Sequence, residues 1–166
     1  MSMKCIGYLL ASVSFSFAMA SCSGNEDFSD EQFIPQTYNV QGKVEKGPFI
    51  SGSEISIQPM DAKLQVLGSM FNTSITDDLG NFVLGSKEFS TPYVEFIANG
   101  YFFNEVKGEL SNGTLTLRAL VDLKDNTTVN VNVLTHLKYA RIINLVASGK
   151  RFDEAKHKRS YWMPLD

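Results

Sequence analysis

Between residues 38 and 133, short runs of alternating apolar and polar residues recur, with Gly- or Pro-containing turns between them. Alternation with a period of two is typical of a strand that buries one face. The expected strands cover residues 38–44, 54–58, 70–76, 81–84, 93–97, 115–120 and 129–133. Short strands separated by turns in this way predict an antiparallel β-sandwich.

Residues 77–81, Asp-Asp-Leu-Gly-Asn, carry the strongest turn signal in the chain. The Asp77 carboxylate can accept hydrogen bonds from the backbone of the turn, and Gly80 can take the positive φ that tight turns require. Asp77, Asp78 and Asn81 are also oxygen ligands of the kind that calcium binds, but a calcium site takes about six or more oxygens. The hairpin interpretation is therefore favoured, and we expect no bound metal or cofactor.

After residue 133 the apolar residues recur at helical spacing. The expected apolar stripe consists of Leu134, Leu137, Ala140, Ile143 and Val146, with Ile142 and Leu145 alongside. Thr135 is the expected N-cap, and Gly149 is a suitable residue to end the helix in the left-handed conformation. A second, shorter helix is expected over residues 151–159, with acidic residues early and basic residues late, as the helix dipole favours.

The N-terminus has the order of an export signal: a basic Lys4, an apolar stretch over residues 5–20, and small residues before Cys22. A transmembrane helix needs about 20 consecutive apolar residues, and this shorter run is interrupted by three serines. Plain secretion has no need of a Cys at this position. The Met-Ala-Ser-Cys sequence at residues 19–22 resembles the lipobox of bacterial lipoproteins, with Met19 where Leu is usual.

The lipobox resemblance implies that the chain is cleaved before Cys22 and that acylation of Cys22 anchors the mature protein in a membrane. Several acyl chains together bind firmly, because each buried methylene contributes about 0.8 kcal/mol. The acidic residues 23–27 resemble the export tag of Bacteroidetes surface lipoproteins, which implies the outer face of the outer membrane. The alternatives are a solvated acidic linker and a position on the periplasmic face.

Composition limits the possible partners. The chain has 15 Lys and Arg against 18 Asp and Glu, and loss of Lys4 with the signal leaves 14 against 18, a net charge of −4. Nucleic-acid binding calls for a basic patch and is not expected. The two cysteines are Cys5, which is lost with the signal, and Cys22, which is modified, so no disulfide is expected.

The predicted organisation is a signal peptide over residues 1–21, an acidic flexible tether over 22–36, a β-sandwich domain over 37–133, a helical segment over 134–159 and an irregular tail over 160–166. The tail carries no cap and no apolar period. One hypothesis is that the chain is a truncated or frame-altered product of a longer gene; the alternative is an ordinary frayed terminus.

Four short motifs follow one another in the sandwich region. They are Gly-x-Val at residues 42–44, Gly-Pro-Phe-Ile-Ser-Gly-Ser-x-Ile-x-Ile at 47–57, Thr-Asp-Asp-x-Gly-Asn-Phe at 76–82 and Ala-Asn-Gly-Tyr at 98–101. Their order resembles the carboxypeptidase regulatory-like domain over residues 38–104. This resemblance implies a transthyretin-type sandwich and a non-catalytic accessory role.

The chain offers little that could perform catalysis. Its two histidines, His136 and His157, lack the helix-spaced partners of a zinc peptidase, and no Gly-x-Ser-x-Gly nucleophile elbow or phosphate-binding Gly-rich loop occurs. We therefore expect that the protein is not an enzyme.

Aromatic residues are the remaining candidates for ligand contact. Tyr93, Tyr101, Phe102 and Phe103 lie within 11 residues of one another, together with Phe96. Strand alternation puts Tyr101 and Phe103 on one face and Phe102 on the other. An exposed strip of this kind could stack on sugar rings or receive a partner strand. Packing in the sandwich core is the favoured explanation for most of these residues, because a sandwich core needs aromatic bulk.

The sequence therefore predicts a lipid-anchored cell-envelope protein whose sandwich is a binding, adhesion or spacer module for a glycan or a protein. The alternative is an accessory fragment of a longer exported enzyme whose catalytic domain is missing. Both readings rest on fold-level analogy.

Overall fold

The structure, a computed structural model, describes residues 33–157. The strands are β1 (Gln36–Glu45), β2 (Glu54–Met60), β3 (Phe71–Ser74), β4 (Asn81–Phe89), β5 (Tyr93–Gly100), β6 (Phe103–Asn104), β7 (Glu109–Leu110), β8 (Leu115–Asp122) and β9 (Thr128–Asn132). The helices are α1 (Val133–Ala147) and α2 (Phe152–His157). No helix in the described part of the chain is long and apolar enough to span a membrane.

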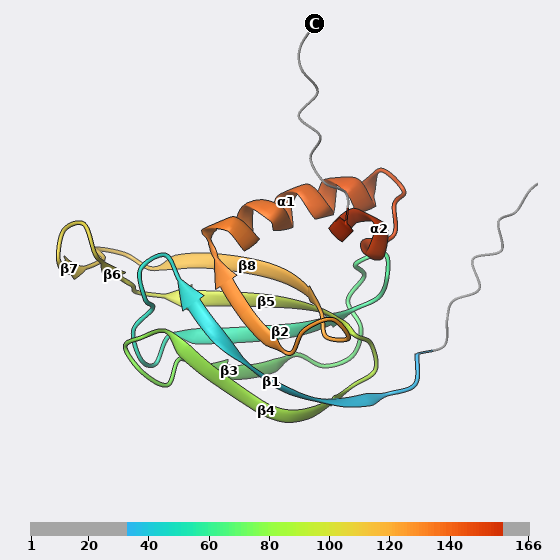
Figure 1. Cartoon of the computed structure of the whole chain (residues 1–166), viewed down its shortest axis with the longest axis horizontal. Helices are drawn as coiled ribbons and strands as arrows, with labels where there is room; N and C mark the ends of the chain where they lie inside the picture. The colour runs from blue at the N-terminus through green and yellow to red at the C-terminus, as the bar shows by residue number, and fades with distance from the viewer. Residues whose placement is uncertain (1–32, 158–166) are drawn as a thin grey trace, which may run out of the picture. The chain divides into compact units, whose positions relative to one another are not determined.

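Two sheets pack face to face, and a small hairpin extends from one end (Figure 1). One sheet has the order β4-β1-β9, the other has the order β3-β2-β5-β8, and β6 pairs with β7 in the hairpin. All pairs between named strands are antiparallel except β1 with β9, which is parallel. The predicted mainly-β sandwich with a C-terminal helical segment is confirmed, with this one parallel pair as a departure from the expected pattern.

The core between the sheets is built from alternate residues of both. Val40 and Val44 from β1, Ile55 and Ile57 from β2, and Phe96 from β5 are fully buried. Phe rings fill the middle of this layer: the ring centroids of Phe82 and Phe96, which belong to opposite sheets, lie 6.1 Å apart. This alternation is the period-two pattern that the sequence predicted, and it fixes which face of each strand is left for other contacts.

The two helices form a third layer on the outer face of the four-stranded sheet (Figure 1). A second apolar cluster lies between the helices and this sheet. In it, Met60 at the end of β2 and Leu64 in the following loop pack with Ile142, Phe152 and Ala155. The helices cover only part of this face. The outer face near the other end of the strands remains open to solvent.

Helix α1 begins two residues earlier than its expected N-cap. Asn132, the last residue of β9, is the N-cap, and its side chain accepts a hydrogen bond from Thr135 N at 2.9 Å. The Thr135 hydroxyl in turn accepts one from Asn132 N at 2.8 Å. Thr135 is therefore the reciprocal partner in a capping box and not the cap itself. The helix ends as expected, with Gly149 at a φ of 93° just beyond it.

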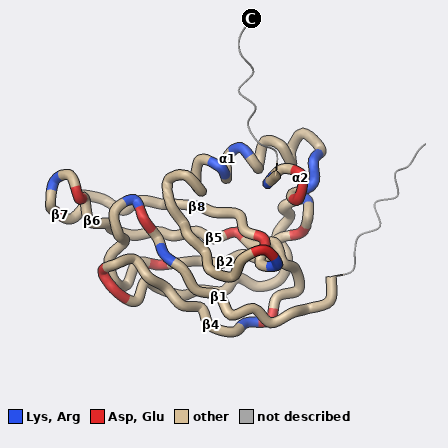
Figure 2. Tube along the Cα trace, viewed as in Figure 1, with Lys and Arg blue, Asp and Glu red and all other residues tan. Residues whose placement is uncertain are grey.

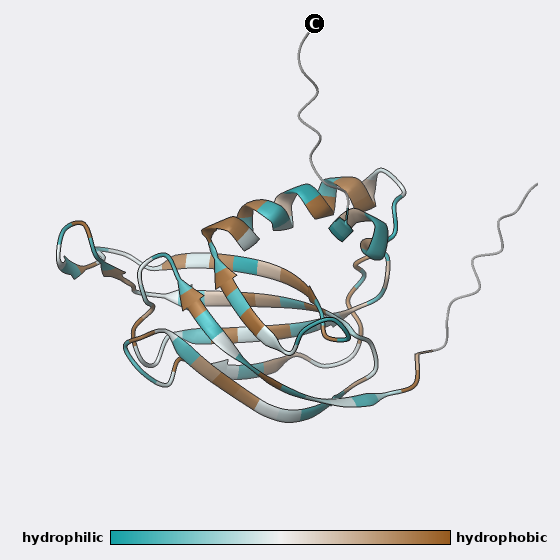
Figure 3. Cartoon of the chain, in the orientation of Figure 1, coloured by the Kyte–Doolittle hydropathy of each residue, from teal (hydrophilic) through white to brown (hydrophobic). Residues whose placement is uncertain are grey.

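The expected apolar stripe of α1 is only partly buried. Ile142 is the buried residue, whereas Leu134 and Leu137 are 76% and 63% exposed. The helix leaves β9 without a connecting loop, and only its second half meets the apolar cluster beneath it. The first two turns consequently present apolar side chains to solvent. The brown segments at the start of α1 in Figure 3 mark its hydrophobic residues.

Strand β2 continues through Pro59, where the sequence predicted its end. Pro59 lies opposite Val94 of β5, and its carbonyl accepts a hydrogen bond from Leu67 N at 2.8 Å, on the other side of the strand. The N and the C=O of one strand residue point to the same side. The N–H that Pro59 lacks would therefore face the loop that contains Leu67 and not β5. The hydrogen-bond ladder between β2 and β5 consequently loses no bond.

The predicted turn at residues 77–81 is confirmed, but it joins strands of different sheets. Asp77 Oδ1 accepts hydrogen bonds from Leu79 N at 3.0 Å and from Asn81 N at 3.1 Å. The amide side chain of Asn81 donates to the other carboxylate oxygen, and these bonds lower the pKa of Asp77. The turn carries the chain from β3 of the four-stranded sheet to β4 of the three-stranded one.

The close approach of β1 and β9 gives the first prediction. A Cβ on Gly42 would collide with the Val129 carbonyl oxygen, which belongs to the backbone of β9 and cannot rotate away. We expect Gly42→Ala to lower the free energy of unfolding by about 2–4 kcal/mol, measured by denaturant unfolding followed by circular dichroism. Gly113→Ala is the control, because a Cβ there meets nothing within 4 Å. Equal losses in both variants would contradict the close packing.

Candidate functional site at the loop end of the sandwich

Strand β1 begins at Gln36 at one end of the sandwich, and the loops around the ends of β1 and β5 lie at the other end (Figure 1). We call these loops, residues 46–53, 75–80 and 99–114, the loop end. Backbone hydrogen bonds join the three segments: Ile50 N donates to Tyr101 O at 3.1 Å, and Gly52 N donates to Ile75 O at 2.9 Å. The loop end is therefore a connected surface.

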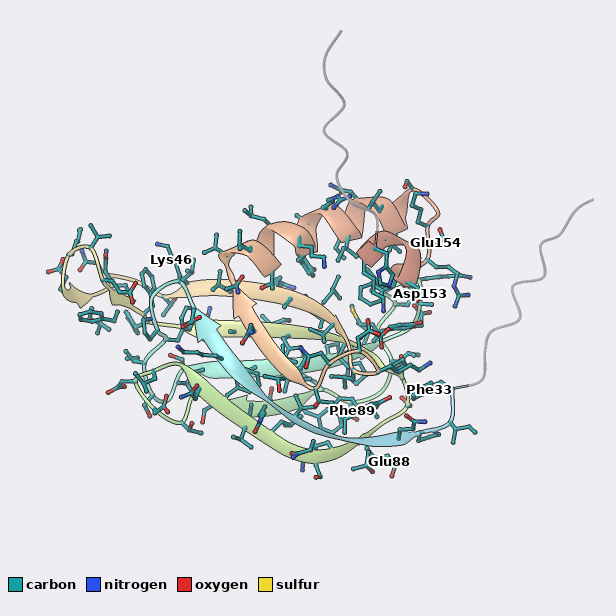
Figure 4. The ribbon with its side chains drawn as sticks, viewed as in Figure 1. Phe33, Lys46, Glu88, Phe89, Asp153 and Glu154 are labelled. Carbon is teal, nitrogen blue, oxygen red and sulfur yellow. The ribbon has the colours of Figure 1, made fainter. Side chains whose placement is uncertain are left out.

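Three of the four predicted contact residues lie at the loop end. Tyr101 and Phe103 are 43% and 42% exposed, as the strand alternation predicted. Phe102 points the other way and stacks on the buried Phe49, with ring centroids 6.2 Å apart. The ammonium of Lys46, labelled in Figure 4, lies 4.5 Å from the centre of the Phe102 ring. Phe102 is thus packed between Phe49 and Lys46 and has little surface to offer a ligand.

Tyr93 does not join this group. It lies at the opposite end of β5, which places it about 25 Å from Tyr101 at the usual rise of a strand. Its ring packs edge-on against Phe152, with centroids 5.1 Å apart, and its hydroxyl donates to Asp153 of α2 at 2.6 Å. Burial and this carboxylate raise the pKa of Tyr93. Tyr93 connects the sheet to the helical layer.

A shallow pocket of about 320 Å³ lies beside Tyr101. Its walls come from the turn at residues 50–53, from Glu54 at the start of β2, from residues 99–101 at the end of β5, and from Thr114 before β8. The volume is at the lower end of the range for small-ligand sites, about 300–1,000 Å³. An exposed aromatic ring and several polar groups therefore border one concave surface.

The turn at residues 50–53 has the shape it needs because of Gly52. Ser53 N donates to Ile50 O at 3.2 Å, which closes a four-residue turn, and Gly52 in its third position has a φ of 84°. This arrangement is a type II turn, which requires a residue that tolerates positive φ there. Asp78, from the turn between the sheets, accepts a hydrogen bond from Ser51 N at 3.0 Å and holds the pocket wall in place.

Most polar side chains of the pocket have no partner in the described part of the chain. Among residues 33–157, no hydrogen bond or ion pair involves the Glu54 carboxylate, the Tyr101 hydroxyl or the Thr114 hydroxyl. Asn99 is the exception, because its amide donates to Thr116 Oγ1 at 2.6 Å. The buried Ser53 hydroxyl also lacks a partner there.

The outer face of the four-stranded sheet continues the pocket. Across the strands, Ser74 pairs with Glu54, Glu54 with Asn99, and Asn99 with Thr116. The buried residues next to them in each strand face the core, so these four side chains share the outer face. A row of hydroxyl, carboxylate, amide and hydroxyl groups therefore runs across the sheet beside Tyr101.

Elsewhere on the same face, charged side chains hold the helices in place. Arg118 of β8 donates to the buried Glu95 of β5 at 2.6 Å, and its guanidinium lies 5.6 Å from the ring centre of Tyr139 in α1. His136 Nδ1 accepts a hydrogen bond from the Arg118 backbone N–H at 3.1 Å, which satisfies a donor on the open edge of β8. These groups serve the packing of α1.

Helix α2 is bound through Lys156. Its ammonium donates to Asp122 at the end of β8, at 2.5 Å, and to Asp125 in the next loop, at 2.8 Å. Burial opposes the charge of Lys156, but these two hydrogen bonds outweigh it and raise its pKa. The hydrogen bond from Lys156 lowers the pKa of Asp125. Figure 2 shows acidic residues beside basic ones in this region.

Residues 33–157 contain no group of three or more His, Cys, Asp or Glu side chains placed to bind one metal ion. His157 is exposed at the end of α2, far from His136 in sequence.

Cys22, the predicted site of acylation, lies outside the described residues, as does the acidic stretch after it. Phe33, at the start of the described part, lies under the ammonium of Lys124, 5.1 Å from its ring centre (Figure 4).

Comparisons with known proteins identify no relative: the chain matches no family model, no curated protein and no solved structure.

Sequence analysis missed most of the pocket. Ser53 was assigned to a turn and Glu54 to the start of a strand. Thr114 was assigned no role. Ser53 and Glu54 meet Tyr101 because β2 pairs with β5, with Glu54 opposite Asn99. Thr114 meets it because β8 pairs with β5, with Leu115 opposite Gly100. The only local signal was Tyr101 itself, an aromatic residue directly after the Asn-Gly sequence that ends β5.

The ion pairs of α2 give a second prediction. Lys156→Met keeps the bulk of the side chain but removes its charge, and we expect a loss of about 1–3 kcal/mol in the free energy of unfolding at pH 7. Lys63→Met, at an exposed lysine in the loop after β2, is the control and should change stability little.

The pH dependence of this loss follows from Asp125. Because its pKa is lowered in the folded protein, its contribution is complete above its ordinary value of 3.8 and disappears as the pH falls through the lower folded value. The difference between wild type and Lys156→Met should therefore shrink as the pH falls below 3.8 and through the lower folded pKa of Asp125. A difference that stays constant over this range would contradict the role of Asp125.

Proposed function

We propose that this chain is a lipid-anchored cell-envelope protein whose β-sandwich acts as a non-catalytic binding or adhesion module on the cell surface. The sequence supports the anchor, through the lipobox-like residues 19–22, and the acidic stretch after Cys22 supports surface export. The motifs that resemble the carboxypeptidase regulatory-like domain support an accessory role.

One observation in the described residues carries the binding role. The exposed ring of Tyr101 and the unpartnered polar groups of the pocket lie at the end of the sandwich opposite to Gln36, where the chain comes from the predicted tether. Strand β1 has ten residues and therefore spans about 33 Å between these ends. A module attached to a membrane through its N-terminus would present such an end outward.

The anchor is tested by the mass of the mature N-terminus and by protease treatment of intact cells, with wild type and Cys22→Ala compared. We expect wild type to carry acyl chains on Cys22 and to be cleaved from whole cells, because two or more acyl chains hold a protein firmly in a bilayer. Cys22→Ala should lose the acyl mass and leave the membrane fraction.

Two results would change the proposal. An acylated protein that resists protease on intact cells, but is cleaved after the outer membrane is opened, would face the periplasm and contradict surface display. An unmodified Cys22 in wild type would contradict the lipid anchor. A strictly periplasmic protein of the same host serves as the control for cell integrity.

A further inference from the structure

We infer that the pocket beside Tyr101 binds one or two uncharged pyranose units of a glycan. This inference rests on the proposed binding role and names its ligand class. The polar row of β3, β2, β5 and β8 and the pocket at its end would form the contact surface, and the ring of Tyr101 would form its wall.

The first argument is the pairing of one aromatic ring with a dense set of hydrogen-bonding groups. Sugars present apolar C–H groups on the faces of the ring and hydroxyl groups around its edge. An exposed Tyr is amphipathic in the same way, with an apolar ring face and a polar hydroxyl. Tyr101 is 43% exposed, and its backbone carbonyl accepts a hydrogen bond from Ile50 N at 3.1 Å. The ring is thus available to a ligand, and the backbone that carries it is fixed to the neighbouring turn.

The second argument is the unmet hydrogen-bonding capacity of the pocket. The Glu54 carboxylate can accept two hydroxyl hydrogens in charge-assisted bonds, and the Thr114 hydroxyl can donate as well as accept. Neither group has a partner among the described residues, and Ser53, 7% exposed in the pocket wall, also keeps an unpartnered hydroxyl. The Ser53 oxygen is closed off from solvent, so the hydrogen-bonding capacity that the surface offers a ligand is that of Glu54 and Thr114.

The third argument concerns charge. Glu54 is the one charged side chain that lines the pocket in the described part of the chain, and no Lys or Arg lines it. A carboxylate with no cation beside it repels uronic acids, sialic acids and phosphates. The surface therefore selects against anionic sugars. The spacing of neighbouring strands, about 4.8 Å, lets a chain of sugar rings contact successive side chains of the row.

The test is saturation-transfer NMR, which detects weak binding through the signals of the sugar. The full acylated chain is purified in a detergent without a sugar headgroup. The probes are maltohexaose, cellohexaose and mannohexaose, with hexagalacturonate as the anionic control. We expect transfer from the protein to at least one neutral hexamer and none to hexagalacturonate, with dissociation constants from titrations of the same signal.

Variants locate the binding. Tyr101→Ala should raise the dissociation constant about tenfold or more, because it removes the ring that forms the wall. Glu54→Gln keeps the shape but not the charge and should raise it severalfold. Phe103→Ala is the matched control, because Phe103 is equally exposed but does not line the pocket, and should leave binding within twofold. Equal melting temperatures confirm that all variants fold.

Absence of transfer to every neutral hexamer would overturn the inference, as would equal binding of hexagalacturonate. Loss of binding in Phe103→Ala but not in Tyr101→Ala would overturn the assignment of the pocket. Failure of the glycan inference can be distinguished from failure of the proposed function. An acylated surface protein that binds no hexamer overturns only the glycan site, whereas binding by a chain that is not acylated in cells overturns only the anchor.

Discussion

The apolar layer between the two sheets is the interaction on which the rest of the structure depends. Both cysteines, Cys5 and Cys22, precede the first strand, so no disulfide joins the elements of the fold. Burial must supply the stability that a covalent crosslink would otherwise add. The core accordingly uses large rings from both sheets, Phe82 and Phe96 among them, and its register decides which side chains remain on the outer faces. The helical layer and the pocket both lie on the outer face of the four-stranded sheet, which the core does not use.

The helical layer shows how polar pairs complete the packing. Glu95 and Asp122 are nearly buried on the outer face of the sheet, and each meets a cation, Arg118 and Lys156 respectively. Pairs of this kind add little net free energy, because desolvation offsets most of the attraction, but an unpaired partner would be costly. They therefore fix where the helices sit more than they add to stability.

The parts of the fold that depend on neighbours in sequence were predictable. The Asp77–Gly80 turn and the end of α1 at Gly149 follow from the conformations that these residues favour. Predictions failed where distant partners decide. Leu134 and Leu137 have the spacing of a buried stripe, yet the direct passage from β9 into α1 leaves them exposed. The pocket depends in the same way on strand register, and for that reason only Tyr101 of its residues could be named in advance.

The position of the pocket in the fold follows from the direction of β5. This strand carries Tyr93 at one end and Tyr101 just beyond the other. At the first end the helices cover the sheet, and Tyr93 is used to hold them, through its hydrogen bond to Asp153. At the second end no helix covers the sheet, so the same alternation that buries Ala98 exposes Asn99 beside Glu54. The two tyrosines at the ends of β5 therefore have different roles. Tyr93, at the covered end, supports the structure, and Tyr101, just beyond the open end, can contact a ligand.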